Sequence, residues 1–197
     1  MFKKIDFFFF GWIINFCYPE YYRPKYGYQR YYILFFHYLI PQKLFRLNPK
    51  VNWPVHFTSK VLSPEKITKG ILCDPGDNLN NYIQASNGIV FGSNIELGPG
   101  VSIISSNHKQ DNLREHTKGT PINIGNNVWI GANTTILPEV TIGNNVTIGA
   151  NSLVNKNIPD NSVAVGNPCK VIKSKEKYTE DLSAIIFNRK VTKNKQC

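Results

Sequence analysis

The 197-residue sequence predicts an all-β fold, a parallel β-helix of hexapeptide repeats, on the basis of two observations. Apolar residues recur at every sixth position through the middle of the chain, and Gly and Asn recur in phase with them. A period of six matches neither the 3.6 of an α-helix nor the simple alternation of a strand. It matches a solenoid in which three short strands form a triangular coil of about eighteen residues, so that stacked coils bury a continuous core.

Two apolar rows carry the repeat. The first begins with Val55, Val61 and Ile67 and continues through Ile83, Ile89, Ile95, Val101, Ile122, Val128, Thr134, Val140, Val146, Ser152 and Ile158. The second lies two residues further on and comprises Phe91, Leu97, Ile103, Ile124, Ile130, Ile136, Ile142, Ile148 and Val154. We expect both rows to point into the core of the solenoid.

Residues suited to tight corners lie between the rows. Gly92, Gly98, Gly125, Gly131, Gly143 and Gly149 follow the second row directly, and Asn127, Asn133, Asn145 and Asn151 follow it at the third position. Both residue types tolerate a positive φ, so we expect them to form the corners between strands. A β-sandwich would instead need turns at intervals of about 8 to 12 residues.

The repeat divides the chain into three regions: an aromatic, basic N-terminal segment (1–50), the β-helix domain (51–173), and a C-terminal helix with a basic tail (174–197). Residues 1–46 hold 18 of the 25 Phe, Trp and Tyr residues. Aromatic residues interleaved with Lys and Arg suit a helix lying at lipid headgroups. The same residues would also suit packing on the catalytic domain or across a subunit interface, and the sequence leaves both open.

The net charge of +10 is concentrated at the two ends of the chain, which argues against a continuous groove for nucleic acid. The four cysteines have neither the C-x-x-C spacing of a zinc site nor the density of a disulfide scaffold. We therefore expect a cytoplasmic protein, with peripheral contact to the inner face of the membrane through residues 1–46.

The period is lost between Ile103 and Ile122, where the insert 105–120 is polar apart from one Leu. A solenoid can accommodate such a segment only as an extruded loop, and loops on rigid scaffolds commonly carry functional sites. The insert contains His108 and His116. A neutral imidazole can accept a proton from a hydroxyl near neutral pH, which makes His108 a candidate general base. Asp111 or Glu115 could orient it.

Three stretches resemble the hexapeptide-repeat acetyltransferases, in particular the group containing maltose, galactoside and capsular-polysaccharide O-acetyltransferases. They are Asn107-His108, residues 121–133 (PINIGNNVWIGAN) and residues 163–173 (VAVGNPCKVIK). The resemblance covers roughly residues 50–173. It implies a left-handed β-helix, acetyl-CoA as the acetyl donor, no metal, and a homotrimer with its sites between neighbouring subunits.

The resemblance also implies roles for individual residues. His108 is the catalytic base, and Asn87, Asn107 and Trp129 contact the acceptor. Backbone groups of Ala132 and Ala150 bind the pantetheine arm of the coenzyme. Asn155 and Lys156 stand where the family has Thr-Lys, and Lys170 and Lys173 lie where basic residues meet the coenzyme phosphates. Glu139 departs from the family, which has a glycine after Pro138.

The acceptor stays open. We expect a sugar hydroxyl in a surface polysaccharide or its lipid-linked precursor, because the aromatic and basic N-terminal segment suggests work at a membrane. Serine, an amino sugar or an antibiotic hydroxyl are alternatives. Of other classes, a zinc carbonic anhydrase needs three converging histidines, and only His108 and His116 lie in the repeat. A non-catalytic β-helix scaffold is the remaining alternative.

Overall fold

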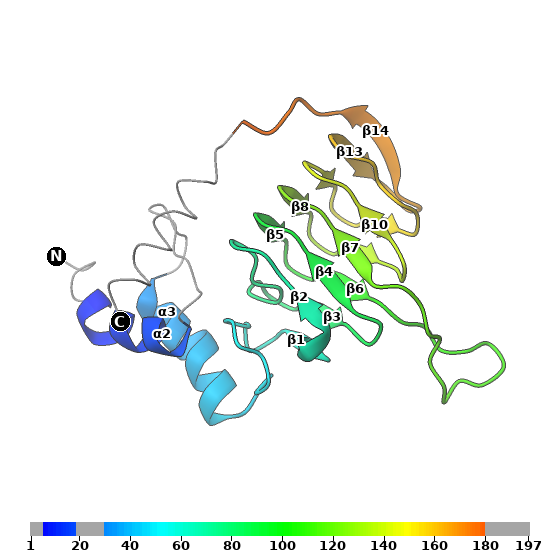
Figure 1. Ribbon diagram of the computed structural model, residues 1–197. Helices are drawn as coiled ribbons and strands as arrows, with labels where there is room; N and C mark the ends of the chain where they lie inside the picture. The colour runs from blue at the N-terminus through cyan, green and yellow to red at the C-terminus, as the bar shows by residue number, and fades with distance from the viewer. Residues whose placement is uncertain (1–5, 19–29, 180–197) are drawn as a thin grey trace.

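The computed structural model describes residues 6–18 and 30–179. In Figure 1 the described chain forms a stack of triangular coils with a pair of helical segments beside its first coil. The coils carry the predicted repeat, and the helical segments belong to the aromatic N-terminal region.

The N-terminal region forms two helical segments. The first is the π-helix η1 (Phe7–Gly11) continued by α2 (Trp12–Cys17), and the second is α3 (Tyr31–Leu34) continued by the π-helix η2 (Phe35–Leu44). Their inner faces share a small core of Ile14, Tyr18, Leu34, Tyr38 and Leu39. Across the described residues, no helix combines the length and the apolar character needed to cross a bilayer.

The strands of the described residues form three sheets, which are called sheets A, B and C here. Sheet A contains β1 (Lys60–Leu62), β3 (Tyr82–Gln84), β6 (Ser102–Ile104), β9 (Thr135–Ile136) and β12 (Leu153–Val154). Sheet B contains β2 (Ile67–Thr68), β4 (Ile89–Phe91), β7 (Ile122–Ile124) and β10 (Thr141–Ile142), and a 3₁₀ turn, η3 (Pro64–Lys66), precedes β2. Sheet C contains β5 (Ile95–Leu97), β8 (Val128–Ile130), β11 (Thr147–Ile148), β13 (Ser162–Val165) and β14 (Lys170–Ser174).

From β3 to β12, successive strands of the chain lie in sheets A, B and C in turn, and the pairs within each sheet are parallel except for β13 with β14. The result is the predicted left-handed parallel β-helix. Its three edges are named after the sheets that meet there. The A–B edge connects sheet A to sheet B, the B–C edge connects B to C, and the C–A edge returns the chain to sheet A.

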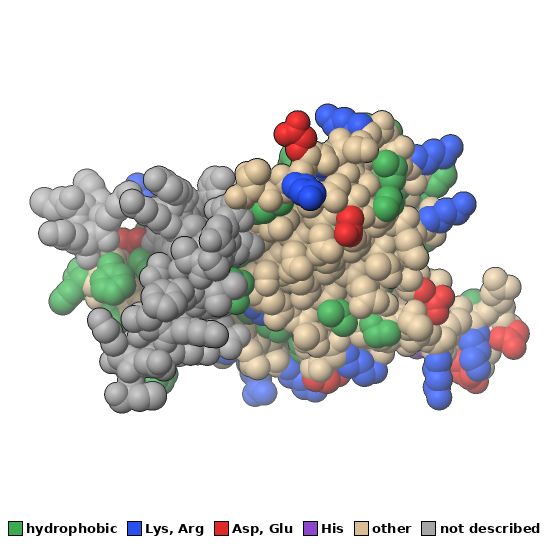
Figure 2. Space-filling view, turned by 45° about the horizontal axis from the view of Figure 1, so that its top comes forward, with side chains coloured by type: hydrophobic (Ala, Val, Ile, Leu, Met, Phe, Trp, Pro, Cys, Tyr) green, Lys and Arg blue, Asp and Glu red, His purple; other side chains and the backbone are tan. Residues whose placement is uncertain are grey.

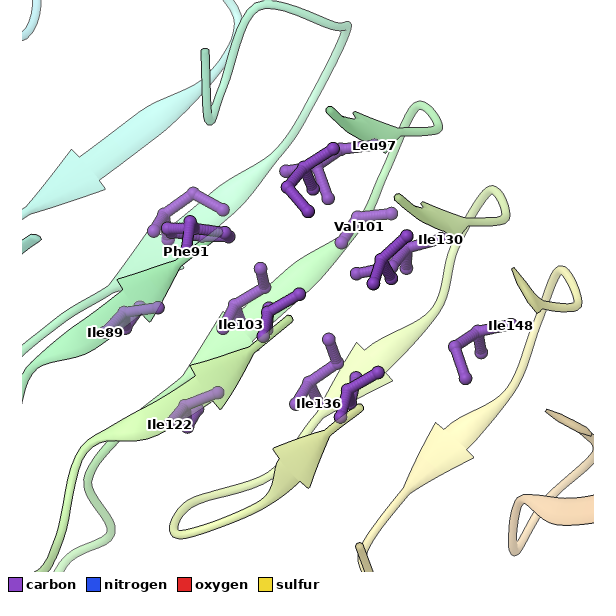
Figure 3. Close-up of a cluster of buried hydrophobic side chains, with 14 of the residues drawn as sticks. Ile89, Phe91, Leu97, Val101, Ile103, Ile122, Ile130, Ile136 and Ile148 are labelled. Carbon is purple, nitrogen blue, oxygen red and sulfur yellow. The ribbon is translucent and has the colours of Figure 1, made fainter. Parts of the chain in front are cut away.

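The two predicted rows form the core. Both rows are buried from Ile83 to Ile158, including the polar members Thr134 and Ser152, whose hydroxyls donate to the carbonyl of Gly149. The strand register stacks isoleucine on isoleucine in successive coils, since Ile103 of β6 pairs with Ile83 on one side and with Ile136 on the other. Figure 3 shows these side chains pointing into the interior from all three sheets.

Asparagine forms the corners as predicted. Asn127, Asn133, Asn145 and Asn151 all have φ between 54° and 57°. Asparagines also bond between coils, since the amide of Asn145 donates to Oδ1 of Asn161 at 2.8 Å. The asparagine rows are thus accounted for by corner geometry.

The prediction that the glycine row adopts a positive φ was wrong. None of the six glycines that follow the second apolar row has a positive φ. They lie instead where one coil touches the next. A Cβ on Gly125 would be 2.7 Å from the carbonyl of Gly143, and one on Gly131 would be 2.5 Å from the backbone nitrogen of Ala150. Glycine is required here because stacked backbones leave no room for a side chain.

Gln42 of η2 joins the helical region to the β-helix. Its buried side chain accepts a hydrogen bond from the Tyr18 hydroxyl at 2.8 Å and donates one to the Val51 carbonyl at 2.8 Å. Because an unpartnered buried amide would be costly, this residue fixes how the helices sit on the first coil.

At the other end of the β-helix, β14 folds back and adds an antiparallel strand to sheet C beside β13. Of the C-terminal helix and tail predicted for residues 174–197, residues 180–197 lie outside the described residues.

A Gly125→Ala substitution should destabilise the protein by about 1–3 kcal/mol, because the added methyl group overlaps the backbone of the next coil. Asn123→Ala, at an exposed position on the same coil, should change stability by less than about 0.5 kcal/mol. Urea unfolding of the two variants measures the difference, and equal stabilities would contradict the close-contact explanation.

Candidate functional site

The extruded loop leaves the A–B edge between β6 and β7 and projects away from the coils (Figure 1). Its two arms pair as a short antiparallel ladder. Thr117 N–H donates to the Asn107 carbonyl at 2.8 Å, and Lys109 N–H donates to the Glu115 carbonyl at 2.9 Å. The loop is therefore an ordered hairpin, which can hold a side chain at a fixed place.

His108 and His116 face each other across this hairpin, with ring centroids 4.4 Å apart. Both side chains are exposed in the single chain. An exposed imidazole on an ordered loop is open to a ligand arriving from solvent or from another subunit.

Neither carboxylate considered as an orienting partner is bonded to His108. Glu115 forms an ion pair with Lys109 and accepts a hydrogen bond from the Asn112 amide at 2.9 Å. Asp111 is exposed and has no hydrogen bond to either histidine within residues 6–18 and 30–179. In the described chain the imidazole of His108 thus lacks an acidic partner.

Asn87 lies on the same edge, at the foot of the loop. Its side-chain amide donates to the Thr117 carbonyl at 3.0 Å, and its backbone N–H donates to the Ser105 hydroxyl at 2.9 Å. The predicted acceptor contact is thus at the base of the loop, where its amide already helps to hold one arm. Asn107, next to His108, is exposed.

Glu139, for which the sequence suggested no purpose, is a further residue of this edge. Its carboxylate accepts the Thr120 N–H at 3.3 Å and lies against Gly119, where the loop returns to β7. Glu139 has a φ of 65°, a conformation that is strained for a residue with a side chain. Glu139 therefore helps to hold the returning arm of the loop in place. The departure from the family glycine at this position was the sequence signal for such a role.

Trp129 lies on another face. It is the central residue of β8 in sheet C, it is 58% exposed, and it is flanked in register by Glu96 of β5 and Thr147 of β11. Sheet C is the face opposite the A–B edge, so the structure does not bring Trp129 and His108 of one chain together.

Ala132 and Ala150 occupy equivalent positions on the C–A edge, one coil apart. The carbonyl of Ala132 accepts a bond from Asn151 N–H at 2.8 Å. Within the described chain, the N–H groups of both alanines have no hydrogen-bond acceptor. Backbone donors that project from an edge can bind the amides of an extended ligand.

The other residues predicted to bind the coenzyme separate in the same way. Asn155 and Lys156 are exposed at the A–B edge, after β12. Lys170 and Lys173 are exposed on β14, at the end of sheet C. The predicted site residues therefore form two groups: an A–B group with the histidine loop, and a C–A group with the free backbone donors, Trp129 and the β14 lysines.

A group of acidic side chains lies near the first coils, with Glu96 next to Trp129 in sheet C. Burial raises the pKa of Asp77 well above its usual range, and Asp74 adds to the effect. Burial likewise raises the pKa of Glu96. Asp74 is paired with Lys69 at 3.1 Å. Among residues 6–18 and 30–179, no cluster of three or more His, Cys, Asp or Glu side chains could hold a metal ion.

Comparison with known proteins agrees with this architecture. The family model described as bacterial transferase hexapeptide (six repeats) matches residues 121–156, which contain β7 to β12. A protein of Saccharomyces cerevisiae named as an acetyltransferase is 39% identical over 131 residues, which are 60% of this chain and 65% of that protein. The galactoside O-acetyltransferase of Escherichia coli K12 is 43% identical over 99 residues, 49% of each chain.

A solved galactoside acetyltransferase in complex with coenzyme A is 31% identical, and the alignment covers 63% of this chain and 68% of that one, with a TM-score of 0.40. Residues 121–156 thus carry the repeat of the hexapeptide transferases. This hexapeptide-repeat chain spans only about half to two thirds of the length of the two curated relatives named above.

Glu139→Gly should loosen the loop without weakening the β-helix. Glycine relieves the strained φ, and the loss of a hydrogen bond to Thr120 of about 1 kcal/mol should speed opening of the loop about fivefold. Limited trypsin digestion, with cleavage expected in the loop at Lys109, Arg114 and Lys118, measures this opening.

The matched control is Glu139→Gln, whose side-chain oxygen can still accept the Thr120 N–H. It should be cleaved at the rate of the parent, while thermal unfolding of the glycine variant should be no earlier than that of the parent. Equal cleavage of all three proteins would remove Glu139 from the account of the loop.

Proposed function

We propose that this protein transfers an acetyl group from acetyl-CoA to the hydroxyl of a sugar in a surface polysaccharide or its lipid-linked precursor. The observation that carries the proposal is the ordered hairpin that interrupts a hexapeptide-repeat β-helix and presents His108 at its surface. The identity of 43% over 99 residues to a galactoside O-acetyltransferase supports a sugar as the acceptor.

In this proposal His108 acts as the general base. Its neutral imidazole accepts the proton of the acceptor hydroxyl while the hydroxyl oxygen attacks the thioester carbonyl. The carbon–sulfur bond of the resulting tetrahedral intermediate then breaks, and the imidazolium returns the proton to the departing thiolate. The products are an acetyl ester and free coenzyme A, and the enzyme regains its starting state.

The coenzyme is assigned to the C–A group. The free N–H groups of Ala132 and Ala150 suit the amide carbonyls of the pantetheine arm, which runs along the coils. Lys170 and Lys173 on β14 suit the phosphates, because lysine acts as a flexible point charge. Asn155 and Lys156 lie at the A–B edge, so in this arrangement they would bind a coenzyme held by a neighbouring chain.

The acceptor is assigned to the surroundings of the histidine loop, with Asn87 and Asn107 beside it and Trp129 of a neighbouring chain as a wall. Serine, an amino sugar and an antibiotic hydroxyl remain alternatives with the same chemistry. A panel of these acceptors, read by thiol release from acetyl-CoA, distinguishes them.

We further propose a homotrimer, because the two residue groups lie on different edges of one coil stack. Sheet A separates the A–B edge from the C–A edge. A loop that reaches the C–A edge of the next chain would complete a site, and a closed ring of three chains would repeat this contact three times.

We place the reaction in the cytoplasm, at the inner face of the membrane, where lipid-linked sugar precursors would be met. Cys17, Cys73 and Cys169 are free thiols, which agrees with a reducing compartment.

His108→Ala should lower the rate of acetyl transfer by about 100-fold or more, which is the usual cost of losing a general base. His116→Ala, across the same hairpin, should lower it by about tenfold at most. Both side chains are exposed, so neither variant should change thermal unfolding. If His116→Ala proved as damaging as His108→Ala, the assignment of the base would fail. If the parent neither bound nor turned over acetyl-CoA, a non-catalytic scaffold would be the better account.

Shared sites predict rescue in mixed trimers. His108→Ala disables the loop of a chain, and Ala150→Trp blocks its C–A edge. When the two inactive proteins are refolded together, about one quarter of the interfaces should pair two intact halves and regain activity. Light scattering gives the oligomeric state of each protein. Mixed trimers without any activity would place all site residues in one chain.

A further inference from the structure

The helical region presents a second apolar face, turned away from its own core. The side chains that form it are called the aromatic face, namely Phe7, Phe8, Phe9, Trp12, Phe16, Tyr32 and Phe36, and they are 41% to 84% exposed. Figure 2 shows hydrophobic side chains at the surface of this end of the molecule. Contiguous exposed apolar surface of this kind marks an interaction site in a folded protein.

The two helical segments are therefore apolar on both sides. Ile14 of α2 and Tyr18, which directly follows α2, are buried against the second segment, while Trp12 and Phe16 of α2 are exposed. A helix that is hydrophobic all round is stable when it is enclosed by protein or by lipid. The inner side is enclosed by protein, and the outer side needs a partner.

Asp6, Tyr18 and Gln42 of the helical pair have hydrogen-bond partners within the pair. The carboxylate of Asp6 accepts the N–H groups of Tyr31 and Tyr32 at 2.9 and 2.8 Å, and Gln42 binds the Tyr18 hydroxyl inside the pair. Satisfied polar groups are what an apolar medium demands, because no water is present there to replace a missing partner.

The dimensions suit one leaflet. Residues 7–17 and 31–44 form helical segments of at most about 16 and 21 Å, against a hydrocarbon core of about 30 Å. Helices of this length can enter the headgroup and upper acyl region with an aromatic side facing inward.

A basic cleft adjoins the end of η2. It has a volume of about 500 Å³ and is lined in part by Arg46, Lys50 and Lys60, with Glu65 as its one acidic residue. Among residues 30–50 the charged side chains are Arg30, Lys43, Arg46 and Lys50, all of them basic. Basic side chains that follow the aromatic helices in the chain can complement the phosphates of an anionic bilayer.

We propose that the aromatic face and the basic cleft bind an anionic lipid membrane, with the helical pair partly immersed in one leaflet and the β-helix outside it. Aromatic side chains supply apolar contact, and the cleft binds lipid phosphates. Such an arrangement would hold the histidine loop near a lipid-linked acceptor, but membrane binding itself does not depend on the proposed acetyl transfer.

Flotation of the full chain with vesicles tests the proposal. The protein should float with vesicles containing phosphatidylglycerol and more weakly with phosphatidylcholine alone. Phe8→Ser combined with Phe16→Ser should lower the partition coefficient at least tenfold, as expected for about 1.5 kcal/mol or more of lost apolar contact. The matched control, Leu79→Ser with Val90→Ser, removes exposed apolar side chains from the β-helix and should leave binding within about twofold of the parent.

Two further readouts separate lipid from other occupants. Brominated lipid should quench part of the tryptophan fluorescence of the parent, and Trp12→Phe should abolish that part. Replacing Arg46, Lys50 and Lys60 by Gln should reduce binding to phosphatidylglycerol vesicles by about fivefold per residue, with a smaller effect on neutral vesicles.

Three outcomes would contradict the membrane-binding proposal without contradicting the acetyl-transfer proposal. The parent could remain unbound to either kind of vesicle. Light scattering without lipid could show an assembly that Phe8→Ser with Phe16→Ser dissociates, which would assign the aromatic face to a second copy of the chain. Inorganic phosphate could displace the vesicles more strongly than chloride of equal ionic strength, which would make the cleft a site for free phosphate.

Discussion

Close stacking of the coils is the constraint on which the rest of this structure depends. Parallel strands in the three sheets must approach to the ordinary spacing of about 4.8 Å all the way along the stack. Each residue then lies against its equivalent in the next coil, about eighteen positions further along the chain, and only certain residues fit at each place. The core accepts Ile on Ile, as for Ile83, Ile103 and Ile136. The glycine row exists because a Cβ at Gly125 or Gly131 would overlap the next coil.

Regular stacking also decides where chemistry can be placed. A side chain that points outward from a strand lies in a flat, repetitive surface, and a longer insertion must leave at an edge. The histidine loop leaves at the A–B edge, and contacts from neighbouring coils hold its base: Asn87 from the coil before and Glu139 from the coil after. The rigidity of the stack is thus transmitted to a loop that projects from it.

The two ends of the β-helix meet different surroundings. At the last coil, β14 turns back antiparallel on β13 and carries exposed lysines. At the first coil, the buried side chain of Gln42 fixes the helical pair, which covers that coil while leaving its outer aromatic face exposed. The sequence left a choice between packing on the domain and contact with a membrane surface. The inner faces of the two helical segments pack on each other, Gln42 links them to the first coil, and the outer face is exposed.

The sequence by itself determined the β-helix, both core rows, the corner asparagines and the extruded loop, because each follows from a period that repeats along the chain. Tertiary structure decided what depends on contacts between coils. It showed that the glycine row is required by close contact between coils and that Glu139 bonds to the loop. It also showed that Glu115 pairs with Lys109 and not with His108. It also placed His108 and Trp129 on different faces of the β-helix. The separation of an edge from the opposite sheet is set by the fold and cannot be deduced from the spacing of residues in the sequence.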